Sequence, residues 1–309
     1  MRHFLSFEEV ELTNTWATIG TFDGVHRGHQ AILVPLAQQA RAAGATPVVV
    51  TFYPHPMVVL RGASGPMYLT SPQERARMMG ALGIEAVITL TFDRELAALS
   101  AEEFMQRMAD RMGLRQLWVG SDFALGRNRQ GDLPALQVIG QQLGYQLKVI
   151  EPVEQGSERI SSSAIRRLVR EGDVARAAEM LGQPYFLEGP VIHGDKRGRQ
   201  LGFPTANISY WSEKMIPAYG VYATWTVVDG KRLPSVTSVG VRPTFDPPGA
   251  PPRVEAYLMD YDGDLYDQTV RVEFLQYLRP ELRFTSAEAL IEQMVLDTQR
   301  AREVLAHAP

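Results

Sequence analysis

The stretch ATIGTFDGVHRGHQ (residues 17–30) joins the end of an apolar run to a glycine-rich turn and then to a segment with helical spacing. A turn between a strand and a helix presents backbone N–H groups and the positive end of the helix dipole to an anion. His26 and His29 are close enough in sequence to reach one polyphosphate, where imidazole donors stabilise charge on phosphate oxygens. Three glycines would let the backbone approach that ligand: Gly20, Gly24 and Gly28. The stretch therefore predicts a strand–turn–helix unit with a phosphate site.

The alternation of apolar runs and helical segments continues for about the first half of the chain. The apolar runs are TPVVVTFYP (46–54), EAVITLTF (85–92), QLWVGSDF (116–123) and YQLKVIEPV (145–153). They are nearly continuous rather than alternating, which is typical of strands covered by helices on both faces. This pattern predicts an α/β doubly wound parallel sheet, in which ligands bind at the carboxyl ends of the strands.

The second half has a different pattern. From GQPYFLEGP (182–190) to about residue 280 it consists of short strands with turn signals, among them the hairpin-type dipeptides Asp229-Gly230 and Asp262-Gly263. An amphipathic segment, 285–306, follows, with Thr285 or Ser286 as its cap. We expect an antiparallel β-barrel with a C-terminal helix. The predicted domains are residues 1–183 and 184–309.

Composition limits the classes of protein that fit. The 309 residues carry a formal net charge of −4, which argues against a nucleic-acid binder that works through a large basic surface. There is no cysteine, which excludes disulfides, thiolate metal sites and a cysteine nucleophile. The N-terminus lacks the pattern of a secretory signal, and no run approaches the roughly 18 apolar residues of a membrane helix. We expect a cytoplasmic protein with no membrane or nucleic-acid partner.

A second candidate phosphate motif is SERISSSAIRR (157–167). Ser162, Ser163 and Arg166 combine hydroxyls with a guanidinium at an expected helix start, and Arg159 lies just upstream. An ordinary serine cap with surface arginines would give the same pattern. No GxxxxGK[ST] motif occurs, so the chain is not a P-loop protein.

The histidine pair can also be explained without a phosphate. Histidines three residues apart could bind zinc, with His55 as a third ligand and Asp23 nearby. The glycine-rich turn could also be purely structural. Spacing favours a phosphate site without excluding zinc binding or a structural turn.

GTFDGVHRGH (20–29) and ISSSAIR (160–166) together resemble the HxGH and ISSTxIR motifs of the nucleotidyltransferase superfamily. TFYPHP (51–56) and VGSDFALGRNRQGD (119–132) resemble, more narrowly, the adenylyltransferase module of bacterial bifunctional riboflavin kinase/FAD synthetases. The resemblance assigns ATP-phosphate roles to Gly20, Phe22, Gly24, His26, His29, Arg159, Ser162, Ser163 and Arg166, with His26, His29 and Arg166 as catalytic. It assigns the flavin site to Asp122, Phe123 and Asn128. Two residues depart from the family pattern: Ser163 stands where threonine is usual, and Leu125 where an aromatic is usual.

A further candidate site lies in HGDKRGRQLGFPTANI (193–208), which combines a basic glycine-rich loop with Pro-Thr-Ala-Asn. Thr205 and Asn207 would share one side of an extended segment, and their neutral oxygens suit Mg²⁺. The basic side chains that could meet phosphates are Lys196, Arg197 and Arg199. A basic surface hairpin would explain the same residues without a ligand. A kinase also needs a carboxylate near the acceptor hydroxyl, and the spacing leaves both Glu255 and Glu273 open.

GRQLGFPTANI, IPAYGVYA, SVGVRPTF and VEAYLMDYDGDLY occur in the order found in riboflavin kinases, which this half of the chain resembles. The resemblance implies that Thr205 and Asn207 bind Mg-ATP and that Glu255 activates the ribityl 5′-hydroxyl. It adds Gly194, Lys196 and Gly202 to the ATP site, and Arg279 of LRPELRF (278–284) to the flavin site. Asp267 replaces a common glycine, from which we expect a local change of turn.

The resemblance implies a bifunctional transferase of flavin biosynthesis. It would phosphorylate riboflavin to FMN and then transfer AMP to FMN, giving FAD, with ATP as co-substrate and Mg²⁺ as cofactor. We also expect a monomer or weak homo-oligomer. A cytidylyltransferase is the competing enzyme class, because the superfamily shares the histidine pair. The chain could also be a flavin-binding regulatory protein without catalysis, or an enzyme active only as the kinase.

Overall fold

The computed structural model describes residues 1–151, 154–155, 158–194, 202–241 and 252–308. The chain forms two compact units. The first contains Met1–Gly65 and Thr70–Ser162, and the second contains Pro66–Leu69 and Ser163–Pro309. The domain boundary near residue 184 stays a prediction.

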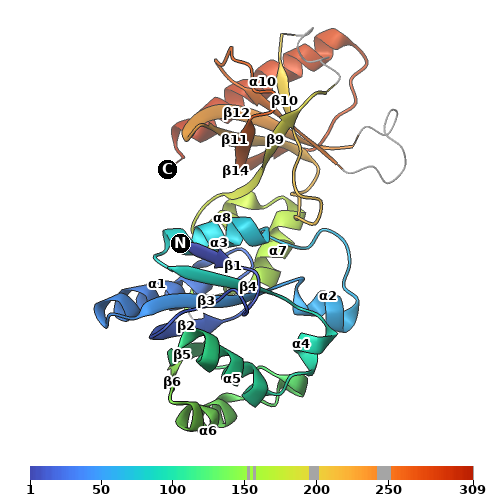
Figure 1. Ribbon diagram of the computed structural model, residues 1–309. Helices are drawn as coiled ribbons and strands as arrows, with labels where there is room; N and C mark the ends of the chain where they lie inside the picture. Colours follow the sequence, from blue (N-terminus) through green and yellow to red (C-terminus); the bar gives the residue numbers. More distant parts are fainter. Residues whose placement is uncertain (152–153, 156–157, 195–201, 242–251, 309) are drawn as a thin grey trace. The chain divides into compact units, whose positions relative to one another are not determined.

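A six-stranded sheet forms the centre of the first unit, with the order β1-β4-β3-β2-β5-β6 (Figure 1). All its neighbouring strands are parallel. Its strands are β1 (Arg2–Phe4), β2 (Thr15–Ile19), β3 (Thr46–Tyr53), β4 (Ala86–Thr91), β5 (Leu114–Gly120) and β6 (Gln146–Ile150). Its helices are α1 (Arg27–Ala42), α2 (Pro56–Arg61), α3 (Pro72–Ala81), α4 (Arg94–Ala98), α5 (Ala101–Met112) and α6 (Leu133–Leu143), with the 3₁₀ turn η1 (Arg127–Arg129) and the short pair β7 (Glu154–Gln155) and β8 (Glu158–Arg159). The predicted doubly wound parallel sheet is confirmed.

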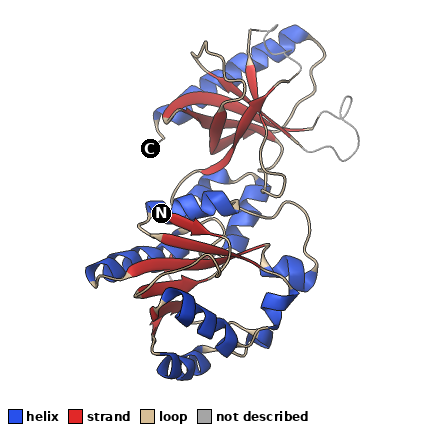
Figure 2. Cartoon of the chain, in the orientation of Figure 1, coloured by secondary structure: helices blue, strands red, loops and turns tan. Residues whose placement is uncertain are grey.

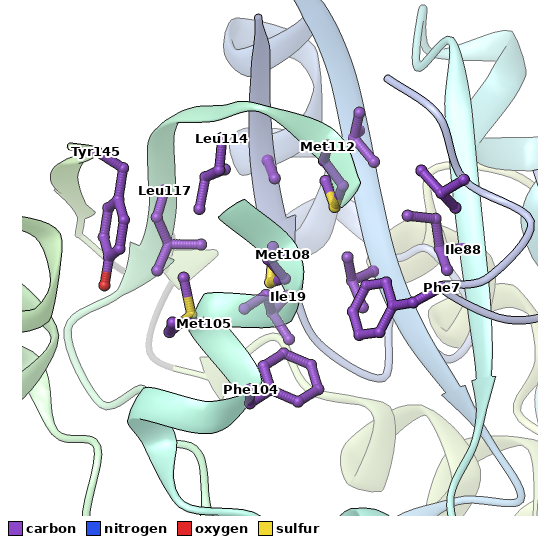
Figure 3. Packing of buried hydrophobic residues seen from close by; sticks show 14 of the residues in the cluster. Phe7, Ile19, Ile88, Phe104, Met105, Met108, Met112, Leu114, Leu117 and Tyr145 are labelled. Carbon is purple, nitrogen blue, oxygen red and sulfur yellow. The ribbon is translucent and has the colours of Figure 1, made fainter. Parts of the chain in front are cut away.

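The side chains of successive strand residues pack in two separate cores, one on each face of the sheet, which explains the nearly continuous apolar runs. Val48 and Val50 of β3 belong to one core, and Val49 between them belongs to the other. Side chains of α5, including Met105 and Met108, fill the first core (Figure 3). The second core lies under α1 and α3. The sheet is therefore covered on both faces.

In the second unit, six antiparallel strands close into a barrel; strands are red in Figure 2. Their order is β10-β13-β12-β11-β14-β9. They are β9 (Tyr185–Ile192), β10 (Thr205–Ile208), β11 (Gly220–Val228), β12 (Lys231–Gly240), β13 (Arg253–Leu258) and β14 (Thr269–Arg279). The helices that follow or precede the barrel are α7 (Ser162–Glu171), α8 (Val174–Leu181) and α10 (Ala287–Ala306). Ser286 caps α10, and its side chain accepts the N–H of Ala289. The predicted barrel with a C-terminal helix is confirmed.

The two dipeptides that suggested hairpins behave differently. Asp229-Gly230 forms the two-residue turn between β11 and β12, and both residues have positive φ, as a type I′ turn requires. The expectation of a hairpin at Asp262-Gly263 is wrong, because β13 pairs with β10 and β12 while β14 pairs with β11 and β9. A turn dipeptide marks a change of direction but does not decide which strands become neighbours. Asp267, in the same connection, adopts φ 63°, a conformation that favours glycine.

Candidate active sites

The turn after β2 has an unusual backbone. Phe22 and Val25 have φ angles of 47° and 42°, and Gly24 between them has 83°. The aromatic ring of Phe22 lies beside Gly20, where a Cβ would approach it to 3.0 Å. Gly28 is similarly close, since its Cβ would come within 3.2 Å of the His26 ring. The glycines thus allow the turn to pack tightly against its own aromatic side chains.

The two histidines of the turn form one stacked pair. Their ring centroids are 3.5 Å apart with an interplanar angle of 15°, and His26 caps α1 by accepting the N–H of His29 on Nδ1 at 3.3 Å. Burial lowers the pKa of His29 well below its usual value, and the nearby His26 and Arg75 lower it further. His29 is therefore neutral at pH 7. Its buried Nδ1 has no hydrogen-bond partner among the described residues.

A buried network behind the turn was not predicted from the sequence. The side chain of Asp23 is fully buried and accepts the N–H and the hydroxyl of Thr70 at 3.0 and 3.1 Å. Arg75, also buried, lies 3.8 Å from Asp23. The sequence around Thr70 and Arg75 indicates only the start of a helix with Ser71 as its cap, and that cap is confirmed by a capping box with Glu74.

The serine-rich motif reaches the histidine turn through its first helical residue. Ser162 donates its hydroxyl to the carbonyl of Asp23 at 2.9 Å. Ser163 and Arg166 follow on α7, where Nε of Arg166 donates to the carbonyl of Met67 at 2.7 Å. The side chain of Arg159 lies outside the part of the chain that the structure describes.

A cavity of about 570 Å³ opens at the carboxyl ends of β2, β3 and β4. This edge is where ligands bind in open parallel sheets. Of the residues assigned to a flavin site, Phe123 and Asn128 line the cavity, as does Leu125. Asp122 is not among the lining residues, and its carbonyl accepts a hydrogen bond from Arg129 at 3.0 Å. Gly20, on the turn of the histidine pair, also lines this cavity.

A zinc site at the histidine pair would need His55 as a third ligand. Instead, Nδ1 of His55 accepts the N–H of Met57 at 3.1 Å and caps α2. Within the described ranges, no three His, Cys, Asp or Glu side chains gather as a metal site.

In the barrel, Thr205 and Asn207 lie on the same side of β10, as their spacing predicts. Asn207 is directly opposite Glu255 on β13, and Glu255 is in turn opposite Ser238 on β12. Gly194 packs against the amide of Asn207 so closely that a Cβ there would overlap it. An amide oxygen, a carboxylate and a hydroxyl therefore form one row across three neighbouring strands.

Glu255 and Ser238 of this row face a cavity of about 320 Å³ between the barrel and α10, whereas Asn207 is not among its lining residues. Thr205, Ser238 and Glu255 line it from the barrel strands, and Met294 and Asp297 line it from α10. A mixed wall of polar groups and apolar side chains is typical of sites for small organic ligands.

Two further charged groups belong to this cavity. Arg279 lines it and is held by Asp297, with Nε and Nη2 donating at 2.9 and 2.7 Å. Glu281 also lines it, and burial raises the pKa of this carboxyl, Arg279 opposing the rise and Glu255 adding to it.

Sequence spacing left both Glu255 and Glu273 as candidates for the carboxylate near the acceptor hydroxyl, and the structure places them differently. Glu255 lines the cavity, whereas Glu273 on β14 forms an ion pair with Arg232 at 3.0 Å. Of the remaining predicted residues, Gly202 has φ 83°. Lys196, with Arg197 and Arg199, lies outside the described residues.

Three comparisons place the chain among known proteins. The family model for FAD synthetase matches residues 8–164, and the model for riboflavin kinase matches residues 181–305. Two relatives are named bifunctional riboflavin kinase/FMN adenylyltransferase. The one from Pseudomonas fluorescens is 40% identical, and the match covers 94% of this chain and 93% of the relative. The one from Escherichia coli K12 is 36% identical, and the match covers 93% of this chain and 91% of the relative. A crystal structure from Streptococcus pneumoniae, named as a macrolide-efflux protein, aligns with a TM-score of 0.87 at 29% identity, covering 97% of this chain and 98% of that one.

None of the helices in the described part of this chain combines the length and the apolar character needed to cross a membrane. Both matched regions occur in the predicted order, and each contains one of the two sites described above. The chain therefore belongs to the family of bifunctional riboflavin kinase/FMN adenylyltransferases.

Proposed function

We propose that this chain converts riboflavin to FAD in two ATP-dependent steps, each at its own site. What supports the proposal is that each family-matched region carries a separate cavity, with the turn of the histidine pair beside one and Thr205 and Glu255 lining the other. Residues 184–309 carry out the kinase step, and residues 1–183 carry out the adenylyl transfer.

In the kinase step, the ribityl 5′-hydroxyl of riboflavin attacks the γ-phosphorus of ATP. Glu255 accepts the hydroxyl proton as the new P–O bond forms and ADP leaves. Riboflavin occupies the cavity lined by Glu255 and Arg279. Gly194, Gly202 and Lys196 belong to the ATP site, as the resemblance implies.

Thr205 and Asn207 are the residues that would hold Mg²⁺ when Mg-ATP is bound. Their donor atoms fit this ion, because Mg²⁺ prefers a few protein oxygens and completes its shell with phosphate oxygens and water. Bound there, the ion supplies neutralisation of charge on the transferring phosphoryl group. The tight packing of Gly194 against the Asn207 amide fixes one of these donors in place.

In the second step, a phosphate oxygen of FMN attacks the α-phosphorus of a second ATP, and the bond to the β-phosphate breaks to release pyrophosphate. The imidazoles of His26 and His29, the latter neutral because burial lowers its pKa, donate hydrogen bonds to phosphate oxygens as negative charge develops on them. FMN occupies the cavity lined by Phe123 and Asn128, near Asp122. The phosphate-binding roles implied by the resemblance also apply to Gly20, Phe22, Gly24, Arg159, Ser162, Ser163 and Arg166.

We further propose that the enzyme works in the cytoplasm as a monomer or weak homo-oligomer, with flavins and ATP as its partners and without nucleic acid. The acidic net charge and the absence of cysteine support this setting.

The test is to incubate the purified chain with riboflavin, ATP and Mg²⁺ and to separate the flavins by chromatography. We expect FMN first and FAD after it, with both lost when Mg²⁺ is chelated. FMN alone would limit the function to the kinase. Flavin binding without turnover would indicate a regulatory protein, and release of pyrophosphate with CTP in place of ATP would indicate a cytidylyltransferase.

A further inference from the structure

The turn that carries the histidine pair is held from behind by the start of α3. Thr70 lies immediately before the N-cap of α3 and contacts the turn at two points. Its hydroxyl accepts the N–H of Gly24 at 3.1 Å and donates to Oδ1 of Asp23 at 3.1 Å, and its own N–H donates to the same carboxylate oxygen. One side chain thus fixes both a backbone group and a side chain of the turn.

Arg75, one turn further along α3, connects the same turn to the neighbouring strand. Its Nη1 donates to the carbonyl of Thr21 at 2.6 Å and to the hydroxyl of Thr51 on β3 at 3.2 Å. Its Nη2 lies 3.8 Å from Asp23 and donates to the carbonyl of Thr70 at 3.4 Å. Arg75 is 1% exposed and Asp23 is 0% exposed, so both charges have left water.

A buried ion pair of this kind adds little net stability, because desolvation offsets most of the attraction. It does fix geometry, since a guanidinium with several acceptors holds only one arrangement of them. The helix that carries it is itself anchored, because Ala76 and Met79 pack in the same core as Phe22 and Val25 of the turn. The network is therefore suited to holding the turn in one conformation.

We infer that Thr70 and Arg75 are positioning residues for adenylyl transfer. They hold the turn after β2 so that its backbone N–H groups and the His26–His29 pair meet the phosphates of ATP. This inference rests on the proposed function of that site. Positioning matters at this scale, because a misplacement of about 1 Å can reduce a rate by about 10²-fold.

The test uses the full-length chain with Thr70→Val, which keeps the shape of the side chain and removes its hydroxyl. The matched control is Thr89→Val, since Thr89 is also a buried threonine of the first unit and its hydroxyl bonds only the distant His3, at 2.9 Å, among the contacts described. We expect Thr70→Val to lower kcat for FAD formation from FMN by about tenfold or more, with little change in KM for FMN and none in FMN formation. Arg75→Met should lower it similarly, and Arg75→Lys should restore part of the rate.

A second measurement does not depend on turnover. The imidazole resonances of His26 and His29, assigned with His→Gln variants at those positions, report binding of inorganic pyrophosphate with Mg²⁺ at this site. We expect Kd for pyrophosphate to rise several-fold in Thr70→Val, by about as much as a lost hydrogen bond allows, and to stay unchanged in Thr89→Val. Equal Kd values in the wild-type chain and Thr70→Val, or equal rate losses in Thr70→Val and Thr89→Val, would overturn the inference. A wild-type chain that makes no FAD, yet shows the weakened binding in Thr70→Val, would overturn the proposed function and still support Thr70 as a residue that positions the turn for phosphate binding.

Discussion

Asn207 on β10 and Glu255 on β13 are directly opposite each other in the antiparallel pairing of two barrel strands. Opposite residues of such a pair have Cβ atoms about 4.5–5.5 Å apart, so their side chains can act on one substrate. The amide oxygen is suited to a cation and the carboxylate to a proton, which are the two needs of a phosphoryl transfer. This pairing, rather than either residue alone, makes the kinase assignment specific.

The first prediction concerns the proton acceptor of the kinase. Glu255→Gln keeps the size of the side chain but cannot accept the proton of the 5′-hydroxyl. We expect kcat for FMN formation to fall by about 10²-fold or more, as general bases typically contribute. FAD formation from supplied FMN should not change, because it takes place at the other site. Chromatography of the flavins measures both reactions, in separate samples started from riboflavin and from FMN.

Glu273→Gln is the matched control, because Glu273 is also a strand carboxylate of the barrel, does not line the kinase cavity and pairs with Arg232. It should leave kcat for FMN formation within about twofold and cost about 1–3 kcal/mol of stability, because Arg232 is half exposed but the Glu273 carboxylate is buried. If both variants lose the kinase activity equally, Glu255 has no special role.

The second prediction concerns a variant of the adenylyl-transfer site, which should affect FAD formation and not the kinase. His29→Gln removes an imidazole from the stacked pair, and we expect FAD formation to fall by about 10²–10³-fold, as when a donor to a developing negative charge is lost. FMN formation should be unchanged. His3→Gln, which alters a histidine on β1, should leave both reactions intact. Parallel loss of both activities in His29→Gln would contradict the assignment of two independent sites.

How far the sequence alone reaches can be judged from particular residues. The nearly continuous apolar runs predicted the parallel sheet, because Val48, Val49 and Val50 feed cores on both faces. Spacing also put Thr205 and Asn207 on one side of a strand. Such features depend only on local periodicity, which a sequence displays directly.

Features that depend on which strands become neighbours could not be predicted from the sequence. Glu255 and Glu273 have similar local sequences, and only the barrel order shows that one lines a cavity and the other meets Arg232. The same reason explains the wrong hairpin at Asp262-Gly263. The contact between Asp23 and Arg75 was missed because it joins distant segments through burial, for which the sequence carried no spacing signal.

The third prediction is a pH dependence of stability. The pKa of His29 is lowered in the folded chain, mainly by burial. Below about pH 6.5 the unfolded chain takes up a proton at this histidine while the folded chain does not, so the unfolded state binds more protons and stability falls as the pH falls. The slope from this one group is at most about 1.4 kcal/mol per pH unit.

The measurement compares the free energy of unfolding of the wild-type chain and His29→Gln at several values between pH 5 and 8. The free energy of unfolding of the wild-type chain minus that of His29→Gln should be constant above pH 7. Below about pH 6.5 this difference should decrease, because only the wild-type chain loses stability through protonation of His29 in its unfolded state. Because His29 stays neutral, kcat for FAD formation should show no inflection from this residue near pH 6.5. Parallel stability curves over the whole range would mean that His29 titrates normally in the fold.

The last prediction concerns the wall of the kinase cavity. Asp297 on α10 holds Arg279 through bonds of 2.7–3.0 Å and also accepts Nε2 of Gln293 at 2.9 Å. Asp297→Asn removes the charge that fixes the guanidinium, so Arg279 should take up more than one position in the cavity. We expect KM for riboflavin to rise more than kcat falls, together with a loss of about 1–3 kcal/mol of stability, as for hydrogen bonds to charged groups. Asp260→Asn is the matched control. Asp260 also pairs with an arginine, Arg302 of α10, at 2.7 Å, but this pair is exposed to solvent. That variant should cost at most about 1 kcal/mol and leave KM unchanged. A fall in kcat with KM for riboflavin unchanged in Asp297→Asn would show that the Arg279–Asp297 pair does not shape the flavin site.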